Sequence, residues 1–190
     1  MRDYSAKNES AFNEKRSDAS ANRNTIIRVA HDLFALKGPE VSMSVIAREA
    51  KVSRATLYRN FEDKGSLVLA LMHYNLKILE DYADTLAHDE NEFRLLLMKA
   101  AEFQYRYQGL LPFLPQRATH LNERLIQLVQ GPIERAIKRG EVAPSYEVLN
   151  DTVLLIRMLG SVVLPSAILD SKASMNRAWE MLLKGLGAID

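Results

Sequence analysis

Residues 42–64 read SMSVIAREAKVSRATLYRNFEDK, and this stretch decides the fold of the N-terminal part of the chain. Its apolar residues have the spacing of two short amphipathic helices that cross over a shared core. They are Val45, Ile46, Ala47, Ala50, Val52, Leu57 and Phe61. Ser42 or Ser44 can cap the first helix and Ser53 the second, because a hydroxyl oxygen accepts hydrogen bonds from amides of the first turn. The stretch therefore predicts a helix, a tight turn and a second helix.

The second of these helices has a polar and basic outer face. The residues that point away from the expected core are Arg54, Ala55, Thr56, Tyr58, Arg59 and Asn60. Guanidinium, hydroxyl, phenol and amide groups donate hydrogen bonds to phosphates and to base edges. A short basic segment by itself is more often a solvated surface helix than a DNA reader, so the neighbouring segments must decide between the two.

An apolar helix precedes the pair. Its apolar residues recur at helical spacing and are Ile26, Val29, Ala30, Leu33 and Phe34. Gly38 and Pro39 follow and end the helix. Three helices with one shared core result, and this arrangement favours the DNA-reading interpretation over the solvated helix.

In these elements the chain resembles the N-terminal domain of the TetR family of bacterial transcriptional regulators. The matching residues are Phe34, Gly38, Ile46, Ala47, Thr56, Leu57, Tyr58, Phe61 and Lys64, and the resemblance runs from Thr25 to about Leu69. One departure is Lys51, since the family usually has glycine at this turn. Either Lys51 adopts a left-handed backbone conformation, or the turn takes another shape.

The resemblance implies a homodimeric repressor that binds a palindromic operator in double-stranded DNA and is released by a small-molecule effector. The second helix of the pair is then expected to enter the major groove. Arg54, Arg59 and Asn60 are expected to approach bases, and Ala55 to touch a thymine methyl group. Thr56, Tyr58 and Lys64 are expected to hold phosphates. With the two capping residues, the candidate DNA-binding set is Ser42, Ser53, Arg54, Ala55, Thr56, Tyr58, Arg59, Asn60 and Lys64.

The charge of the chain is small but unevenly distributed. The formal net charge of the 190 residues is +1, while residues 25–64 contain seven Lys or Arg against five Asp or Glu. Residues 65–190 contain thirteen Lys or Arg against fifteen Asp or Glu. The basic excess therefore belongs to the segment that we expect to bind DNA, and a weakly basic chain binds DNA better as a dimer.

Composition also excludes several classes of protein. The chain has no cysteine, which excludes disulfides, thiol catalysis and zinc sites built from cysteine. No apolar run approaches the roughly 18 residues that span a bilayer, and the first residues lack the apolar core of a signal peptide. We therefore expect a cytoplasmic protein with no membrane partner.

Three segments are expected along the chain. Residues 1–22 are rich in Ser, Asn, Ala and charge and predict a mobile tail, whose basic residues either touch DNA or belong to an untethered terminus. Residues 23–69 form the helix-turn-helix domain. Residues 70–190 show only helical patterns and form a ligand-binding and dimerisation domain, so the predicted fold class is all-α.

The last two predicted helices, about 146–169 and 174–186, carry more apolar surface than one core requires. By resemblance they pair with their copies across a two-fold axis, and the alternative is that they are core helices of a single protomer. The candidate interface residues are Leu159, Gly160, Val163, Trp179 and Leu182.

The resemblance also implies a small-molecule pocket in the helical body, which is mainly apolar with a few placed polar groups. The candidate lining residues are Phe103, Tyr107, Phe113 and Arg157. Arg157 interrupts the apolar run VLLIRMLGSVV and is a candidate anchor for a ligand carboxylate. A salt bridge within the protein or across a dimer is the alternative for this residue.

Enzymatic readings have little support. The four histidines, His31, His73, His88 and His120, lie on separate segments, and no HExxH, P-loop or nucleophile-elbow pattern accompanies them. We expect no catalytic residue, no metal site and no cofactor. The main alternative function is a helical small-molecule carrier or lipid-binding module whose DNA-binding domain is vestigial.

Overall fold

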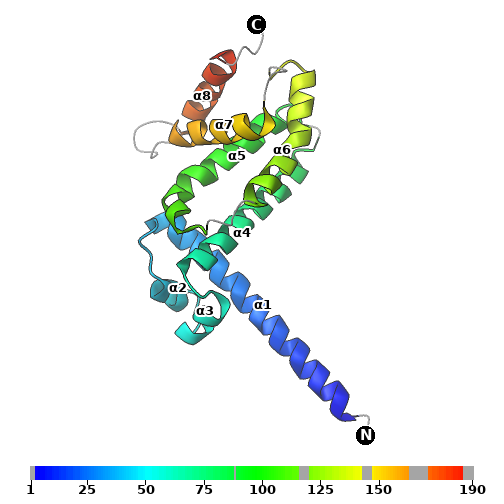
Figure 1. Ribbon diagram of the computed structural model, residues 1–190, viewed down its shortest axis with the longest axis vertical. Coiled ribbons are helices and arrows are strands. Elements are labelled where there is room, and N and C mark those ends of the chain that lie inside the picture. Colours follow the sequence, from blue (N-terminus) through cyan, green and yellow to red (C-terminus); the bar gives the residue numbers. More distant parts are fainter. Residues whose placement is uncertain (1–2, 88, 116–119, 143–146, 163–170, 186–190) are drawn as a thin grey trace. The chain divides into compact units, whose positions relative to one another are not determined.

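The computed structural model describes residues 3–87, 89–115, 120–142, 147–162 and 171–185 (Figure 1). Side chains are described from Ser20 onward within these ranges, except at 148–149, 171–172, 175 and 182–185. Every regular element within these ranges is helical, which confirms the all-α class. None of the described helices is both long and apolar enough to cross a bilayer. The chain divides into two compact units: Met1–Leu71 with Pro112–Pro115, and Met72–Leu111 with Gln116–Asp190.

The first unit contains α1 (Asp3–Lys37), α2 (Met43–Glu49), α3 (Arg54–Asn60) and the start of α4 (Lys64–Thr85). α1, α2 and α3 pack against one another in pairs. Their fully or almost fully buried side chains include Ile26, Ala30, Phe34, Ile46, Ala47, Leu57 and Phe61. α1 ends at Gly38, whose φ is +73° and whose N–H donates to the carbonyl of Phe34 at 2.9 Å. The three-helix core expected from the apolar spacing is therefore present.

The N-terminal segment differs from the expected tail in its backbone. α1 begins at Asp3, so most of residues 1–22 continue the helix that the core fixes further along. No glycine or proline occurs between Asp3 and Lys37, and a helix that is already nucleated propagates easily through such a sequence. A polar composition predicts that a segment has few side chains to bury in a core, but it does not predict where a helix ends. Mobility of this segment, and its contact with DNA, stay predictions.

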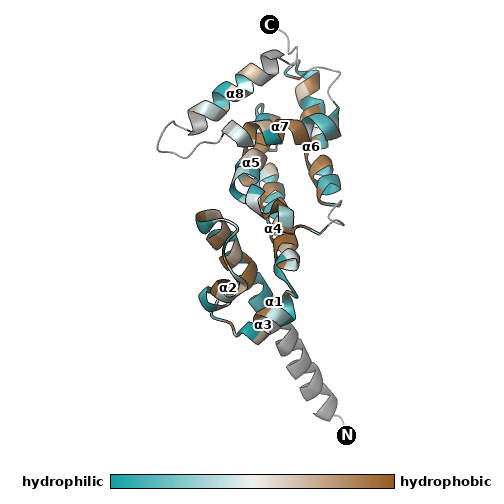
Figure 2. Ribbon diagram, turned by 60° about the vertical axis from the view of Figure 1, so that its left-hand side comes forward, coloured by the Kyte–Doolittle hydropathy of each residue, from teal (hydrophilic) through white to brown (hydrophobic). Residues whose placement is uncertain are grey.

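The second unit contains the rest of α4, α5 (Glu92–Tyr107), α6 (His120–Lys138), α7 (Val148–Val162) and α8 (Ser171–Gly185). The 3₁₀ helix η1 (Gln108–Phe113) follows α5, and its Pro112 has no N–H for an α-helical hydrogen bond. α5 packs against α6 and α7, and α7 also packs against α8. Figure 2 shows hydrophobic and hydrophilic residues alternating along α4, α5 and α6, as amphipathic helices around a core require.

One apolar cluster forms the core of the second unit. It draws on α4, α5, α6, α7 and α8, and its members include Leu76, Leu79, Phe93, Leu96, Leu97, Val129, Ile133, Leu155, Leu159 and Trp179. Five helices therefore meet in one core, so that a change in one of them is felt by the others.

Candidate nucleic-acid interface

α2 begins and ends at residues whose chemistry fixes its length. Ser42 is the N-cap, with extended backbone angles, and its Oγ accepts a hydrogen bond from the Val45 N–H at 3.3 Å. At the other end Lys51 has a φ of 55°, the left-handed conformation that was one of the two possibilities for this turn. Its N–H donates to the Arg48 carbonyl at 3.1 Å, and the Val52 N–H donates to the Ala47 carbonyl at 3.0 Å. This pair of bonds is a Schellman motif, which usually contains glycine where Lys51 stands.

α3 is only seven residues long and is held at both ends of its inner face. Ser53 is its N-cap, and its Oγ accepts from the Thr56 N–H at 3.1 Å. The side chain of Leu57 is fully buried and that of Phe61 is 2% exposed. Because a helix this short is marginal alone, the cap and these two buried side chains determine its orientation.

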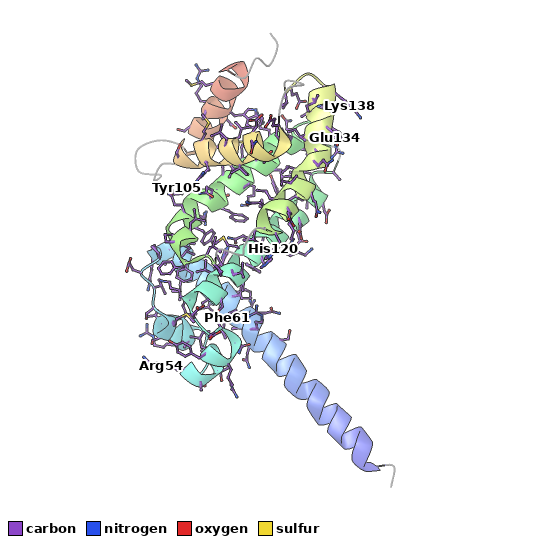
Figure 3. The ribbon with its side chains drawn as sticks, viewed as in Figure 1. Arg54, Phe61, Tyr105, His120, Glu134 and Lys138 are labelled. Atoms are coloured by element: carbon purple, nitrogen blue, oxygen red, sulfur yellow. The ribbon has the colours of Figure 1, made fainter. Side chains whose placement is uncertain are left out.

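The outer face of α3 carries the residues that the sequence singled out. Arg54, Ala55, Tyr58 and Arg59 are exposed, with Tyr58 at 50%. Figure 3 shows Arg54 at the surface of the first unit and Phe61 on the inner side. The Arg59 guanidinium donates to the Thr56 hydroxyl at 3.0 Å, so Thr56 positions Arg59 on this face.

Asn60 ends α3 and is half-buried. Its side-chain amide donates to the Thr56 carbonyl at 2.8 Å. This bond ties the Asn60 side chain to the backbone of its own helix, one turn earlier. Asn60 therefore has a structural contact in addition to the base contact that we predict for it.

Lys64, a predicted phosphate contact, has contacts within the first unit. Its ammonium group contacts the Pro39 carbonyl and lies over the Phe113 ring, 4.2 Å from the centroid. It also lies 5.5 Å from the centroid of Phe34. Lys64 thus joins the loop after α1, the start of α4 and the Pro112–Pro115 segment. An ammonium group has three N–H donors, so a phosphate contact of Lys64 stays a prediction.

Arg23, one of the basic residues near the N-terminus that either touch DNA or belong to an untethered terminus, contacts the end of α3, and the sequence did not predict this contact. Its guanidinium lies 4.4 Å from the centroid of the Phe61 ring and donates to the Asn60 carbonyl at 3.4 Å. A cation at this place interacts favourably with the negative, C-terminal end of the α3 helix dipole. It also adds exposed positive charge beside the candidate DNA-binding face. No local pattern could have revealed this contact, because the two residues are 37 positions apart.

The four candidate pocket residues are distributed over both units, with Phe103, Tyr107 and Arg157 in the second. Phe113 belongs to the first unit and is 40% exposed. Arg157 is exposed on α7, so its charge reaches solvent. Phe103 and Tyr107 are neighbours, with ring centroids 6.3 Å apart on α5. A pocket that these residues line stays a prediction.

Asn75 is a buried polar residue that the sequence did not single out. It lies on α4 and is 5% exposed, and its Oδ1 has no hydrogen-bond partner among the described residues. Leaving such an acceptor without a partner costs about 1–3 kcal/mol. A lone asparagine in an amphipathic helix gives no signal in the sequence, but its burial makes Asn75 a candidate ligand contact.

Three of the five candidate interface residues lie in the core of the second unit instead of on its surface. Leu159 is fully buried, and the Trp179 ring packs edge-on against Phe93 with a centroid separation of 5.9 Å. A Cβ at Gly160 would come within 3.3 Å of the Ala101 carbonyl oxygen, so this glycine permits close contact of α7 with α5. These three residues therefore fit the alternative interpretation, in which the last two helices are core helices of a single protomer.

The other two candidates cannot be placed. Val163 lies outside the described residues, and so does the side chain of Leu182. The apolar side chains that α7 and α8 do expose are Leu154, Met158 and Met181, at 55%, 40% and 63%. These three side chains are on the outer faces of the same helices and replace the buried residues as interface candidates.

Known proteins match the first unit of the chain in sequence. Residues 26–71 match the family described as bacterial regulatory proteins, tetR family. An HTH-type transcriptional regulator of Staphylococcus aureus (strain USA300) is 42% identical over 64 residues, which are 33% of this chain and 35% of that relative. The same identity and coverage hold for the HTH-type regulator of strain MRSA252. The match thus spans about a third of the length of these curated relatives.

Solved structures match over both units. A TetR transcription regulatory protein from Mycobacterium vanbaalenii is 25% identical with a TM-score of 0.61, and the match covers 90% of this chain and 98% of that one. A TetR transcriptional regulator from Streptomyces coelicolor has a TM-score of 0.63 at 20% identity, covering 86% and 97%, and this likeness concerns the fold alone. The sequence match over residues 26–71 therefore assigns the first unit to the tetR family of bacterial regulatory proteins, and the fold of the whole chain is that of solved TetR regulators.

Proposed function

We propose that the chain is a sequence-specific DNA-binding transcriptional regulator that works as a homodimeric repressor. The observation that carries this proposal is the outer face of α3, where Arg54, Tyr58 and Arg59 are exposed on a helix fixed from beneath by Leu57 and Phe61. A rigid helix with exposed donors suits base and phosphate contacts in the major groove. The family of the chain, and the names of its relatives, support this reading.

Each α3 helix reads one half of a palindromic operator. Arg54 and Arg59 approach base edges, and Thr56 and Tyr58 contact phosphates, while Asn60 and Ala55 complete the base contacts. Two copies of α3 enter successive major grooves about 34–36 Å apart. Because much of the affinity comes from phosphate neutralisation, binding falls steeply as salt rises.

The second copy of the chain docks on α7 and α8. Leu154, Met158 and Met181 are large apolar side chains exposed on these two helices. Exposed apolar clusters on a folded chain mark interaction sites, and a two-fold operator calls for a two-fold protein. These exposed side chains support the proposed dimer without any role for Leu159, Gly160 and Trp179, the buried residues that the sequence favoured.

A small-molecule effector binds within the second unit and changes DNA affinity. Asn75 on α4 and the Phe103–Tyr107 pair on α5 are the residues that we propose for contact with it. An effector that donates a hydrogen bond to Asn75 Oδ1 satisfies the buried oxygen. α4 is a single helix that starts in the first unit and continues in the second, so it is the covalent link through which the effector acts.

Selection from a random pool of double-stranded DNA with the purified chain tests the proposal. We expect enrichment of one palindrome whose half-sites are separated by about one helical turn. A folded protein that enriches no sequence at low salt would contradict the proposed function, and effector binding without DNA selection would favour a small-molecule carrier.

A further inference from the structure

Two histidines and an arginine join α4 to α6 in the second unit. The Nε2 atoms of His73 and His120 are 3.1 Å apart, and an Arg124 Nη lies 3.0 Å from His73 Nδ1. The other Nη of Arg124 donates to the carboxylate of Glu80, which lies seven residues after His73 on α4. Figure 3 shows His120 at the end of α6 beside α4. The cluster is outside the residues proposed for DNA, effector and dimer contacts.

The protons of this cluster follow from its donors and acceptors. A guanidinium group only donates, so His73 Nδ1 accepts from Arg124 and carries no proton. Neutral His73 then has its proton on Nε2 and donates it to Nε2 of His120. That nitrogen accepts, so His120 carries its proton on Nδ1. Every contact in the cluster is therefore satisfied when both imidazoles are neutral.

The same geometry argues against a metal ion between the two rings. Their centroids are 5.0 Å apart, much farther than the two Nε2 atoms, so the nitrogens lie on facing edges and point at each other. A metal would need a lone pair on both Nε2 atoms, which moves the His73 proton to Nδ1, against Arg124. No group of three metal-binding side chains occurs among the described residues either.

The charges around the pair make an added proton unfavourable. Partial burial, His120 and Arg124 together lower the pKa of His73 below its ordinary value. A proton on His73 Nδ1 removes the acceptor of Arg124 and places two cations in contact. A proton on Nε2 of His120 leaves two N–H groups facing each other. Glu80 is engaged by Arg124, and the nearby Lys77 is paired with Asp81 at 2.7 Å, so their charges are already partnered.

We propose that His73, His120 and Arg124 form a proton-controlled tie between α4 and α6, closed while both imidazoles are neutral and open when either takes a second proton. His73 follows Met72, the residue at which α4 enters the second unit. When the tie opens, α4 is held less firmly against α6 at this point. If the chain is the regulator proposed above, a looser α4 must be ordered again on the operator, and acidification lowers operator affinity.

A double-mutant cycle tests the tie without DNA. Glutamine is polar and does not titrate, so the unfolding free energies of His73→Gln, His120→Gln and the double variant give the coupling of the pair. We expect coupling at about pH 7.5 and weaker coupling at about pH 5, which lies below the pKa of an ordinary imidazole, while the lowered pKa of His73 delays its protonation. His31→Gln, a histidine change in the first unit, is the control and should leave the coupling unaltered. Equal coupling at both pH values, or none at neutral pH, would overturn the tie.

Ring-proton NMR of the unmodified protein gives a second readout that needs no variant. Titrations of His73 and His120 should be mutually dependent, since a proton on either ring changes the bond to the other. Two independent single-site titrations would overturn the proposal even if the variants did not fold.

Operator binding tests the link to function. Between about pH 7.5 and about pH 5.5 the affinity of the wild type should fall at least about fivefold more than that of His73→Gln. Equal falls in both proteins would overturn the link to DNA. Absence of any specific DNA binding by the wild type at neutral pH would instead contradict the proposed function, while the cycle would still decide whether the tie exists.

Discussion

Arg54 is the first residue of α3, and its side chain is exposed at the surface of the first unit. Replacing it with alanine removes a predicted base contact but no buried packing. Arg54→Ala should therefore weaken operator binding by about 1–3 kcal/mol and leave binding to random DNA almost unchanged. Fluorescence anisotropy with the two kinds of duplex measures both affinities.

A matched variant separates base reading from loss of charge. Arg106 is a partly exposed arginine on α5 that pairs with Glu102 at 2.7 Å. Arg106→Ala should change neither affinity by more than a small factor. If Arg54→Ala weakened operator and random duplexes equally, Arg54 would be a phosphate contact and its assigned base-reading role would be wrong.

Lys51 is the residue whose backbone is least suited to its side chain. Its φ of 55° costs an ordinary residue about 1–2 kcal/mol, whereas glycine adopts this conformation freely. Part of the gain is offset by the greater freedom of glycine in the unfolded chain. Lys51→Gly should therefore raise the unfolding free energy by up to about 1 kcal/mol, measured by urea denaturation.

A glycine substitution inside α2 is the control. Glu49 is the last residue of α2 and has ordinary helical surroundings, so Glu49→Gly should lower the unfolding free energy by up to about 1 kcal/mol. A loss of stability in Lys51→Gly would show that the lysine side chain has a stabilising role that outweighs the strain.

At the scale of the element, α3 depends on its cap. Seven residues make few intrahelical bonds, and the Ser53 hydroxyl satisfies the Thr56 N–H at 3.1 Å while also contacting the Thr56 hydroxyl at 2.9 Å. Ser53→Ala should lower the unfolding free energy by about 1 kcal/mol and should also weaken operator binding, because Thr56 positions Arg59. Thermal unfolding and anisotropy report the two effects.

Ser42→Ala provides the comparison, because it removes the equivalent cap of α2. The loss of stability should be similar, but the loss of operator affinity should be smaller, since α2 does not carry the reading face. Equal losses of affinity in both variants would mean that α3 has no special role in binding.

The elements of the first unit could be predicted because their signals are local. The caps Ser42 and Ser53 and the end of α1 at Gly38 each involve residues within a few positions of one another. The contacts of Arg23 with Asn60 and of Lys64 with Pro39 join residues 37 and 25 positions apart. Periodicity carries no information about such pairs, so these contacts were not predicted.

The faces of α7 and α8 could not be predicted for another reason. A helix that is apolar on most sides can pack with either face, and its sequence does not distinguish its own core from a partner. Leu159 and Trp179 proved to be core residues, while Leu154 and Met181 are exposed. The pattern identified helices with an excess of apolar surface but assigned part of that excess to side chains that are buried, Leu159 and Trp179 among them.

At the scale of the whole molecule, the exposed apolar side chains of α7 and α8 predict self-association. Leu154 is 55% exposed, and a carboxylate there would be buried without a partner in a dimer. Leu154→Glu should therefore convert the protein to a monomer at micromolar concentration and reduce operator affinity. Sedimentation equilibrium measures the mass of the protein in solution.

Leu36 on α1 offers a matched control, since it is also an exposed leucine, at 80%. Leu36→Glu should leave the oligomeric state unchanged. A wild-type protein that is monomeric throughout, or a Leu154→Glu variant that remains a dimer, would contradict the proposed interface on α7 and α8.

The central claim is that a dimer of this chain reads a DNA sequence through α3. Its most direct test is the affinity of the wild type for the selected palindrome and for a scrambled duplex of equal length and composition, at about 150 mM salt. We predict a preference of at least about 10³-fold for the palindrome, with one dimer bound per duplex. Equal affinities for the two duplexes would contradict the account.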